Sequence, residues 1–230
     1  MKKKVLALIP ARSGSKRLKN KNILQINNKP LIYYTISKSL KSKYINYTLV
    51  STDSNKISKV STKFGAKVPF LRPKRLSTDK SKMIDVIKHS VNFLEKKKLY
   101  FDYVILLQPS SPLRKSSHID EAIKFFDKIS DKANSLFSVS HSKTKNWVGS
   151  LTKQNKLKGF NISGKKDFEN YTLNGSIYIF KTSYIKKVKK LDLNKTYGFI
   201  IDKKYSLDID CLYQFKICKL ILEKKDKYFI

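Results

Sequence analysis

The chain has 230 residues and 40% hydrophobic content, enough for one domain with a sizeable buried core, and it contains no run of 18 apolar residues that could span a membrane. Its 50 lysines and arginines stand against 17 acidic residues, which gives a formal net charge of +33. Because the lysines are spread through every segment instead of one stripe or tail, we expect no specific nucleic-acid partner, although the positive field would attract an anionic nucleotide.

Continuous apolar runs alternate with segments of helical spacing along most of the chain. Strands are predicted at 5–9, 47–52, 66–70, 103–107 and 134–140. Helices are predicted between them at 29–41, 54–65, 78–98 and 116–129, the second capped by Asp53 or Ser54 and ended by Gly65. This order predicts an α/β fold with a mostly parallel sheet and helices on both faces. Ligands of such sheets bind beyond the carboxyl ends of the strands.

The pattern changes after residue 141. Residues 142–170 contain turn residues and no helical period, and we expect an inserted hairpin or arm at 141–172 within a single domain spanning 1–230. Strand character returns at 172–181, and 207–225 leads from a strand end into a closing helix. Cys211 and Cys218 are too far apart along that helix for a disulfide, which favours a reduced, cytoplasmic protein.

Arginine is rare in this lysine-rich chain, and several arginines flank unusual sequence. It stands only at positions 12, 17, 72, 75 and 114. The loop after the first strand reads IPARSGSKRLKN (9–20), in which small residues allow backbone amides to approach phosphate. The Walker and G-x-G-x-x-G patterns are absent, but a guanidinium fork can hold two phosphate oxygens where an ammonium cannot.

A second polar stretch follows the predicted strand at 103–107. Gln108, Ser110 and Ser111 leave the same edge of the sheet as the first loop. We therefore expect the functional site where these two loops converge.

Six stretches of this chain together resemble one known family. They are IPARSGSKRLKNKNI (9–23), VSTDS (50–54), LRPKRLSTD (71–79), LLQPSSPLR (106–114), NGSIYI (174–179) and SLDID (206–210). Over nearly the whole chain, they resemble the CMP-sialic acid synthetases, or acylneuraminate cytidylyltransferases. The resemblance implies a Rossmann-like nucleotidyltransferase fold, dependence on Mg²⁺, and a homodimer formed through the arm.

The activity implied by the resemblance is CTP-dependent transfer of CMP to the anomeric hydroxyl of a nine-carbon acidic sugar, such as sialic acid or legionaminic acid, for cell-surface glycan synthesis. Pyrophosphate is released. Chemistry of this kind depends on charge neutralisation and in-line positioning.

Roles for individual residues follow from their places in the family motifs. The resemblance implies a nucleotide site made of Ala11, Arg12, Ser13, Gly14, Ser15, Lys16, Lys21, Asn22, Arg72 and Ser81. The implied sugar site consists of Gln108, Ser110, Ser111 and Asn174. The implied catalytic residues are Arg12, Lys21, Asp208 and Asp210.

Asp208 and Asp210 are candidate metal ligands. Residues two apart in an extended segment point to one face, so both carboxylates can meet one Mg²⁺ together with phosphate oxygens. The alternative is a pair of caps for the helix that starts near Cys211. Because the first loop is expected to bind phosphate, we favour the role of Asp208 and Asp210 as metal ligands over the capping role.

Thr172 departs from the family pattern, because members often carry arginine at this position before the NG pair. The carboxylate of an acidic sugar needs a cation, so we expect Lys143 or Lys145 of the arm to supply it. A sugar other than N-acetylneuraminate, such as legionaminate, is then favoured.

Three alternatives stay open. An eight-carbon Kdo-type cytidylyltransferase is the nearest, although NG-x-I-Y-I and the KN that ends the first loop favour the nine-carbon group. A glycosyltransferase with a D-x-D motif would carry its acidic pair earlier in the chain. A basic nucleic-acid-binding protein without catalysis would use the net charge.

Overall fold

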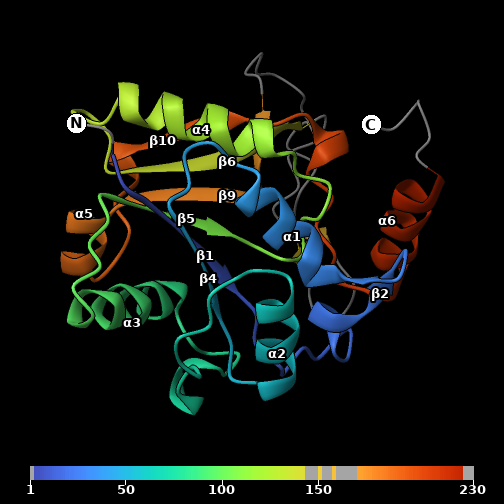
Figure 1. Ribbon diagram of the computed structural model, residues 1–230. Coiled ribbons are helices and arrows are strands. Elements are labelled where there is room, and N and C mark those ends of the chain that lie inside the picture. The colour runs from blue at the N-terminus through green and yellow to red at the C-terminus, as the bar shows by residue number, and fades with distance from the viewer. Residues whose placement is uncertain (1–2, 143–149, 152–156, 159–169, 225–230) are drawn as a thin grey trace.

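The computed structural model describes residues 3–142, 150–151, 157–158 and 170–224 (Figure 1). Within these residues six strands form one sheet, in the order β10-β6-β9-β5-β1-β4. Their bounds are β1 Val5–Pro10, β4 Tyr47–Ser51, β5 Tyr103–Leu107, β6 Ser135–Ser142, β9 Asn170–Lys181 and β10 Thr196–Ile200. Strand β9 runs antiparallel to β5 and β6, and the other pairings are parallel. The predicted fold class is confirmed.

Helices cover both faces of this sheet (Figure 1). They are α1 Leu31–Leu40, α2 Asn55–Lys63, α3 Met83–Lys96, α4 Ser116–Lys128, α5 Thr182–Lys187 and α6 Leu212–Lys224. The apolar residues of α1, α2 and α4 share one core cluster, whereas those of α3 and α5 share another. Strand β1 shows why a continuous apolar run is needed, because Ala7 and Ile9 enter the first cluster while Leu6 and Leu8 enter the second.

Short elements complete the described chain. They are the hairpins β2 Gln25–Ile26 with β3 Lys29–Pro30 and β7 Ser150–Leu151 with β8 Leu157–Lys158, and the 3₁₀ turns η1 Lys21–Ile23, η2 Lys74–Leu76, η3 Leu193–Lys195 and η4 Lys203–Tyr205. Helix α6 packs against β2 and the start of α1 in a third cluster that includes Ile26, Leu31 and Phe215. No helix in these residues is long and apolar enough to cross a bilayer.

Several boundaries differ from the sequence predictions. The expected strand at 66–70 is wrong: the segment runs beside β4 but makes only isolated bridges, at Lys67 and Leu71. Helix α3 begins at Met83, because the preceding residues 78–81 form a turn closed by the Ser81 hydroxyl. The closing helix begins at Leu212, and residues 207–211 form no strand. Strand β10 and helix α5 were not predicted.

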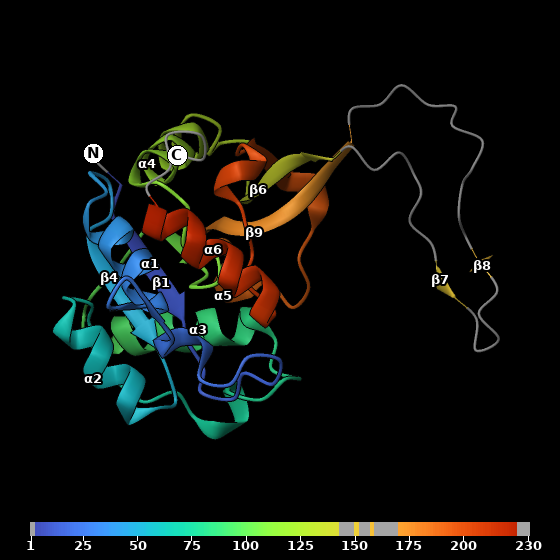
Figure 2. The same ribbon diagram turned by 90° about the vertical axis from the view of Figure 1, so that its right-hand side faces the viewer.

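Most of the predicted arm at 141–172 lies outside the described residues. Its two ends belong to β6 and β9, which remain paired as far as Ser142 and Asn170. Figure 2 shows this two-stranded extension leaving the body of the sheet. Within the arm, β7 and β8 form an antiparallel pair.

A bulge in β9 shapes the edge of the sheet that carries the polar loops. Phe137 pairs with Tyr178 and Val139 with Leu173, so residues 174–177 lie opposite the single residue Ser138. Gly175 has a φ of 71°, a conformation that other residues rarely adopt. The Asn174 amide fills the bulge, since its Oδ1 accepts from the Ser138 hydroxyl and its Nδ2 donates to Ser140.

Arg114 anchors that bulge from beneath. It is fully buried, and its guanidinium donates to the carbonyl of Ser176 at 2.5 Å, to Thr35 Oγ1 at 3.1 Å and to the carbonyl of Gln108 at 3.4 Å. Burial lowers the pKa of Arg114 to about 9. One side chain therefore connects β9, α1 and the end of β5.

We expect Arg114→Lys to lower the free energy of unfolding by about 2–3 kcal/mol, because an ammonium cannot reach all three acceptors and leaves buried carbonyls unpaired. Chemical denaturation measures this change. Arg75→Lys is the matched control, since Arg75 is exposed and its replacement should stay within about 0.5 kcal/mol of the original. Equal losses in the two variants would contradict this role of Arg114.

Candidate active site

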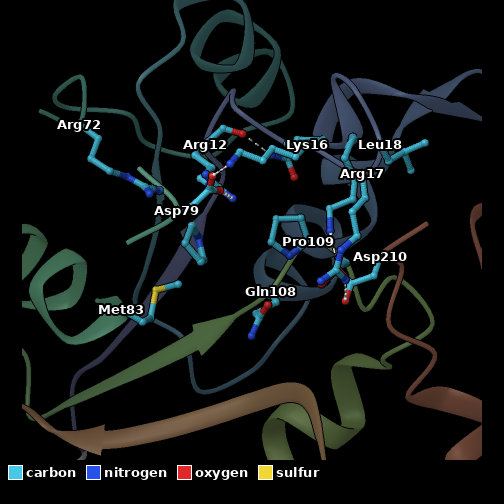
Figure 3. Close-up of a pocket in the computed structure, with 15 residues that line it drawn as sticks. Arg12, Lys16, Arg17, Leu18, Arg72, Asp79, Met83, Gln108, Pro109 and Asp210 are labelled. Carbon is cyan, nitrogen blue, oxygen red and sulfur yellow. Dashed lines mark hydrogen bonds and ion pairs between the residues drawn. The ribbon is translucent and has the colours of Figure 1, made fainter. Parts of the chain in front are cut away.

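A cavity of about 540 Å³ opens at the carboxyl ends of β1 and β5 (Figure 3). Its lining contains Pro10, Arg12, Ser15, Lys16, Arg17, Leu18, Lys21, Asn22, Arg72, Asp79, Met83, Gln108, Pro109, Ser110 and Asp210. The two loops that the sequence predicted to converge therefore do so. Five cationic side chains face two carboxylates in this space, which makes it suited to a polyanion.

Asp53 fixes the first loop at its tip. It accepts hydrogen bonds from the backbone amide of Ser13 at 2.8 Å and from the Ser13 hydroxyl at 2.7 Å. Burial alone would raise the pKa of Asp53, but these hydrogen bonds bring the pKa below its ordinary value. The Asp53 carboxylate thus attaches the first loop to the segment that follows β4.

Arg72 closes the floor of the cavity beside β4. It is 5% exposed, its Nε donates to Ser51 Oγ at 3.0 Å, and its Nη2 donates to the Ser51 carbonyl. Burial lowers the pKa of Arg72 to about 10, and the nearby Asp53 carboxylate partly offsets that effect. The same carbonyl of Ser51 accepts the amide of Ala11, so Arg72 and the first loop share one attachment point.

Arg12 and Lys16 meet one carboxylate across the mouth of the cavity. Asp79 lies 2.5 Å from Arg12 Nη2 and 2.6 Å from Lys16 Nζ. Figure 3 shows the Asp79 carboxylate turned towards Arg12 from the segment that precedes α3. Hydrogen bonds from Lys16 and Arg12 lower the pKa of Asp79.

Lys21 and Arg17 meet the second carboxylate on the opposite side of the cavity. Asp210 lies 3.2 Å from Arg17 Nη1 and 3.4 Å from Lys21 Nζ. Lys21 also donates to the carbonyl of Ile209 at 2.7 Å and is only 19% exposed, so its ammonium is fixed more firmly than that of Lys16, which is 80% exposed. The 206–210 segment is tied to the strand-end loop by the amide of Ile209, which donates to the carbonyl of Ser110.

Asp208 lies behind Asp210, next to the bulge of β9. A Cβ atom placed on Gly175 would lie 3.7 Å from Asp208 Oδ2 and 3.8 Å from Gln108 Nε2, so the bulge brings these side chains to one place. Burial raises the pKa of Asp208 and the charge of Asp210 adds to that effect, while a hydrogen bond from Ser110 and the charge of Lys21 oppose it. Its Oδ1 is buried without a hydrogen-bond partner among the described residues.

The structure separates the predicted site residues into two sets. Nine of them line the cavity: Arg12, Ser15, Lys16, Lys21, Asn22, Arg72, Gln108, Ser110 and Asp210. Seven others, Ala11, Ser13, Gly14, Ser81, Ser111, Asn174 and Asp208, support its walls without lining it. Lys143 and Lys145 lie outside the described residues.

Two of the residues that do not line the cavity, Ser81 and Asn174, have side-chain hydrogen bonds within the fold. Ser81 accepts from the amide of Thr78 and donates to the carbonyl of Arg75, and Asn174 is held within the bulge. Ser111 is buried, and its hydroxyl has no partner among the described residues. Direct contacts of these side chains with a ligand remain predictions.

The alternative capping role of Asp208 and Asp210 gains no support. The amides of Asp210 and Cys211, just before α6, both donate to Gln214 Oε1. The Asp210 carboxylate instead pairs with cations of the first loop. Gln214 therefore bonds the backbone that leads into α6.

Sequence reasoning missed three charged residues in and around this site. Asp79 and Asp53 lie inside the LRPKRLSTD and VSTDS stretches, but no spacing in the sequence connects them to the first loop. Arg17 was noted as a rare arginine without a role. Only the folded chain brings them to Arg12, Ser13 and Asp210.

Known proteins share this combination of fold and sequence. The family model described as Cytidylyltransferase matches residues 6–211. An N-acylneuraminate cytidylyltransferase of Escherichia coli O18:K1:H7 is 36% identical over 99% of this chain, which spans 54% of that protein, about half its length. A CMP-N,N'-diacetyllegionaminic acid synthase of Legionella pneumophila is also 36% identical, over 96% of this chain and 97% of its own length.

Solved structures agree on the fold. A CMP:2-keto-3-deoxy-manno-octonic acid synthetase complexed with CTP superposes with a TM-score of 0.76 at 14% identity, covering 97% of this chain and 100% of that one. A 4-diphosphocytidyl-2C-methyl-D-erythritol synthase superposes with a TM-score of 0.69 at 14% identity, covering 95% and 99% of the two chains. With the family match and the full-length similarity taken together, the chain belongs to the cytidylyltransferase family.

Proposed function

We propose that this protein transfers CMP from CTP to the anomeric hydroxyl of a nine-carbon acidic sugar and releases pyrophosphate. The observation that carries this proposal is the cavity in which Arg12, Lys16 and Lys21 converge beside Gln108 and Asp210. The relatives named as N-acylneuraminate, diacetyllegionaminic and pseudaminic acid enzymes support the sugar class.

The cations of the first loop would bind the triphosphate. The Arg12 fork and the ammonium of Lys16 would take the outer phosphates, because both groups reach the open mouth of the cavity. Lys21, fixed by the carbonyl of Ile209, would hold the phosphate at which the sugar hydroxyl attacks. Neutralising charge on the leaving pyrophosphate favours this in-line displacement.

The wall formed by Arg72 and Asn22 would bind the cytosine base, and the wall formed by Gln108 and Ser110 would bind the sugar. Arg72 and Asn22 are buried but line the cavity, and the Asn22 Nδ2 donates to the carbonyl of Arg12, so the base pocket and the phosphate loop are coupled. Gln108 lies on the other side, next to Ser110 and below the bulge of β9. A sugar hydroxyl or carboxylate there would meet amide and hydroxyl groups.

A divalent cation, Mg²⁺ in our proposal, fits beside Asp208 and Asp210. The buried, unpartnered Oδ1 of Asp208 is an oxygen that lacks a donor or cation, and Asp210 reaches the cavity. Within the described residues, no group of three or more His, Cys, Asp or Glu side chains lies close enough to hold a metal. Mg²⁺ commonly uses one or two carboxylates together with substrate phosphates, and it would stabilise negative charge on those phosphates.

The identity of the sugar and the assembly are further parts of the proposal. Thr172 is exposed and pairs with Ser140 at the base of the arm, so a cation for the sugar carboxylate would come from Lys143 or Lys145. We also propose a homodimer formed through the arm at 141–172 and a cytoplasmic location. Free Cys211 and Cys218 are consistent with a reducing compartment.

The Kdo-type alternative rests on one specific observation, the similarity to the octonic acid synthetase. At 14% identity that similarity supports the fold alone, whereas relatives named for N-acylneuraminate and diacetyllegionaminic acid are 36% identical. The nine-carbon class is therefore favoured.

A pyrophosphate-release assay tests the proposed function. We expect release with CTP plus N-acetylneuraminate or legionaminate. We expect little release with ATP, GTP or UTP, because the proposed base pocket beside the first loop would fit cytosine better than the other bases. Kdo is the comparison sugar. Preference for Kdo would support the eight-carbon alternative, and salt-sensitive DNA binding without turnover would support a nucleic-acid-binding protein.

Arg12→Lys should reduce kcat/KM for CTP about tenfold or more while leaving the fold intact, since a point charge replaces a fork at the phosphates. Steady-state kinetics and thermal denaturation check the two halves of this expectation. Arg75→Lys, an exposed conservative change on η2, should leave kcat/KM unchanged. A lysine variant with near-normal turnover would show that the fork is dispensable.

Asp208→Asn and Asp210→Asn should each raise the Mg²⁺ concentration needed for half-maximal turnover about tenfold or more. Because burial raises the pKa of Asp208, its ionised form is unfavourable in the folded state, and this cost appears as pH rises through the raised pKa. At pH 7, Asp208→Asn should therefore leave the stability of the metal-free protein unchanged or increase it. A loss of stability with normal activity per folded molecule would point to a structural role.

A further inference from the structure

Asp79 forms ion pairs with the two cations that would bind a phosphate chain in the proposed function, Arg12 and Lys16. Its two carboxylate oxygens lie 2.5 Å from Arg12 Nη2 and 2.6 Å from Lys16 Nζ, bridging a guanidinium and an ammonium at the mouth of the cavity (Figure 3). Both cations belong to the loop that follows β1. A carboxylate in that position presents a negative charge and two oxygen acceptors, as two oxygens of a phosphate would.

The turn that carries Asp79 is stabilised by hydrogen bonds between its own residues, and it is anchored to the core by the buried residue that precedes it. Ser81 Oγ lies 3.0 Å from the amide of Thr78, 2.9 Å from the Thr78 hydroxyl and 3.1 Å from the carbonyl of Arg75. Buried Leu76 anchors η2 just before it. Asp79 therefore sits at the tip of a small, hydrogen-bonded turn between η2 and α3.

The ion pairs at this tip can open without uncovering the core. The Asp79 side chain is 40% exposed, and the side chains of Arg12 and Lys16 are 33% and 80% exposed. Asp210 is 50% exposed and pairs with the 74% exposed Arg17, but its second partner, Lys21, is 19% exposed and also bound to a carbonyl. Asp210 therefore shares a cation that is fixed to the backbone, whereas neither cation paired with Asp79 is as deeply placed as Lys21.

Charge repulsion prevents Asp79 and a phosphate from sharing these cations closely. A phosphate that contacts both Arg12 and Lys16 would come within a few ångströms of the Asp79 carboxylate, where like charges oppose binding. One anion must leave when the other arrives. The intramolecular carboxylate then lowers the apparent affinity for any ligand that uses these two cations.

We propose that Asp79 is a specificity-determining residue that competes with the outer phosphates of the substrate and with pyrophosphate for Arg12 and Lys16. The inference rests on the proposed function, in which pyrophosphate is the leaving group. The two ion pairs of Asp79 break when the triphosphate binds, and they form again when pyrophosphate is released. The residue thereby selects against weakly charged anions and promotes release of this product.

Binding measurements on Asp79→Asn test the proposal without turnover. By calorimetry in metal-free buffer, pyrophosphate should bind Asp79→Asn about three- to tenfold more tightly than the unaltered protein, because two exposed ion pairs no longer compete. Cytidine, which has no phosphate, should bind both proteins equally in a titration followed by NMR. Because Asp79 is exposed, thermal denaturation should show little change.

Asp131→Asn is the matched control for charge. Asp131 is exposed in the turn after α4, so its replacement raises the net charge by the same amount without touching the cavity. Pyrophosphate affinity should match that of the unaltered protein. Equal tightening in both variants would assign the effect to the overall field and overturn the role of Asp79.

Mg²⁺ distinguishes the proposal from a role of Asp79 as a ligand of a substrate-bound cation. With Mg²⁺ present, inhibition by pyrophosphate should strengthen in Asp79→Asn by a factor similar to that measured without metal. Weaker binding of Mg²⁺ and pyrophosphate to the variant, or unchanged affinity in both buffers, would overturn the proposal. A protein that does not turn over CTP would refute the proposed function instead, whatever the pyrophosphate affinities are.

Discussion

A buried guanidinium, which has no carboxylate partner among the described residues, connects the elements around the candidate site. Arg114 donates to acceptors on α1, on the bulge of β9 and at the end of β5, so the position of Gln108 depends on it. Removing a charge from water is costly, which is reflected in the lowered pKa of Arg114. Carbonyl and hydroxyl acceptors offset part of that cost, and the Nε of Arg114 is buried without a partner among the described residues.

The bulge that Arg114 supports then places the acidic segment. Gly175 within the bulge lies next to Asp208 and Gln108, and the carbonyl of Ser110 accepts a hydrogen bond from the amide of Ile209. Asp210 is thereby brought to the cavity opposite the first loop. The distance between the cations of the first loop and the carboxylates is set by this framework of backbone contacts, and neither loop could set it alone.

Most cations of the cavity are paired with carboxylates. The chain is strongly basic, and yet four of the five cations that line the cavity are paired with Asp79 or Asp210. Such pairs limit repulsion among neighbouring cations and orient them towards the space between. The positive field attracts an anion from a distance, while the local carboxylates decide how tightly it is held.

The sequence by itself determined the alternation of strands and helices, because doubly buried strands require continuous apolar runs and surface helices require periodic ones. It also determined which loops carry the polar residues, since Arg12, Gln108 and Asp210 follow or join such elements. The capping of α2 by Ser54 and its end at Gly65 were local enough to predict.

Only the tertiary structure decided how the distant segments meet. The partners of Asp79, Asp53 and Arg114 lie tens of residues away, and no local pattern encodes a pairing across such distances. The edge strand β10 is partly exposed and has no continuous apolar run, and the isolated bridges at 66–71 replace a strand that local composition favoured. Local sequence sets backbone preference and burial pattern, whereas contacts between elements arise only when the sheet has assembled around its shared core.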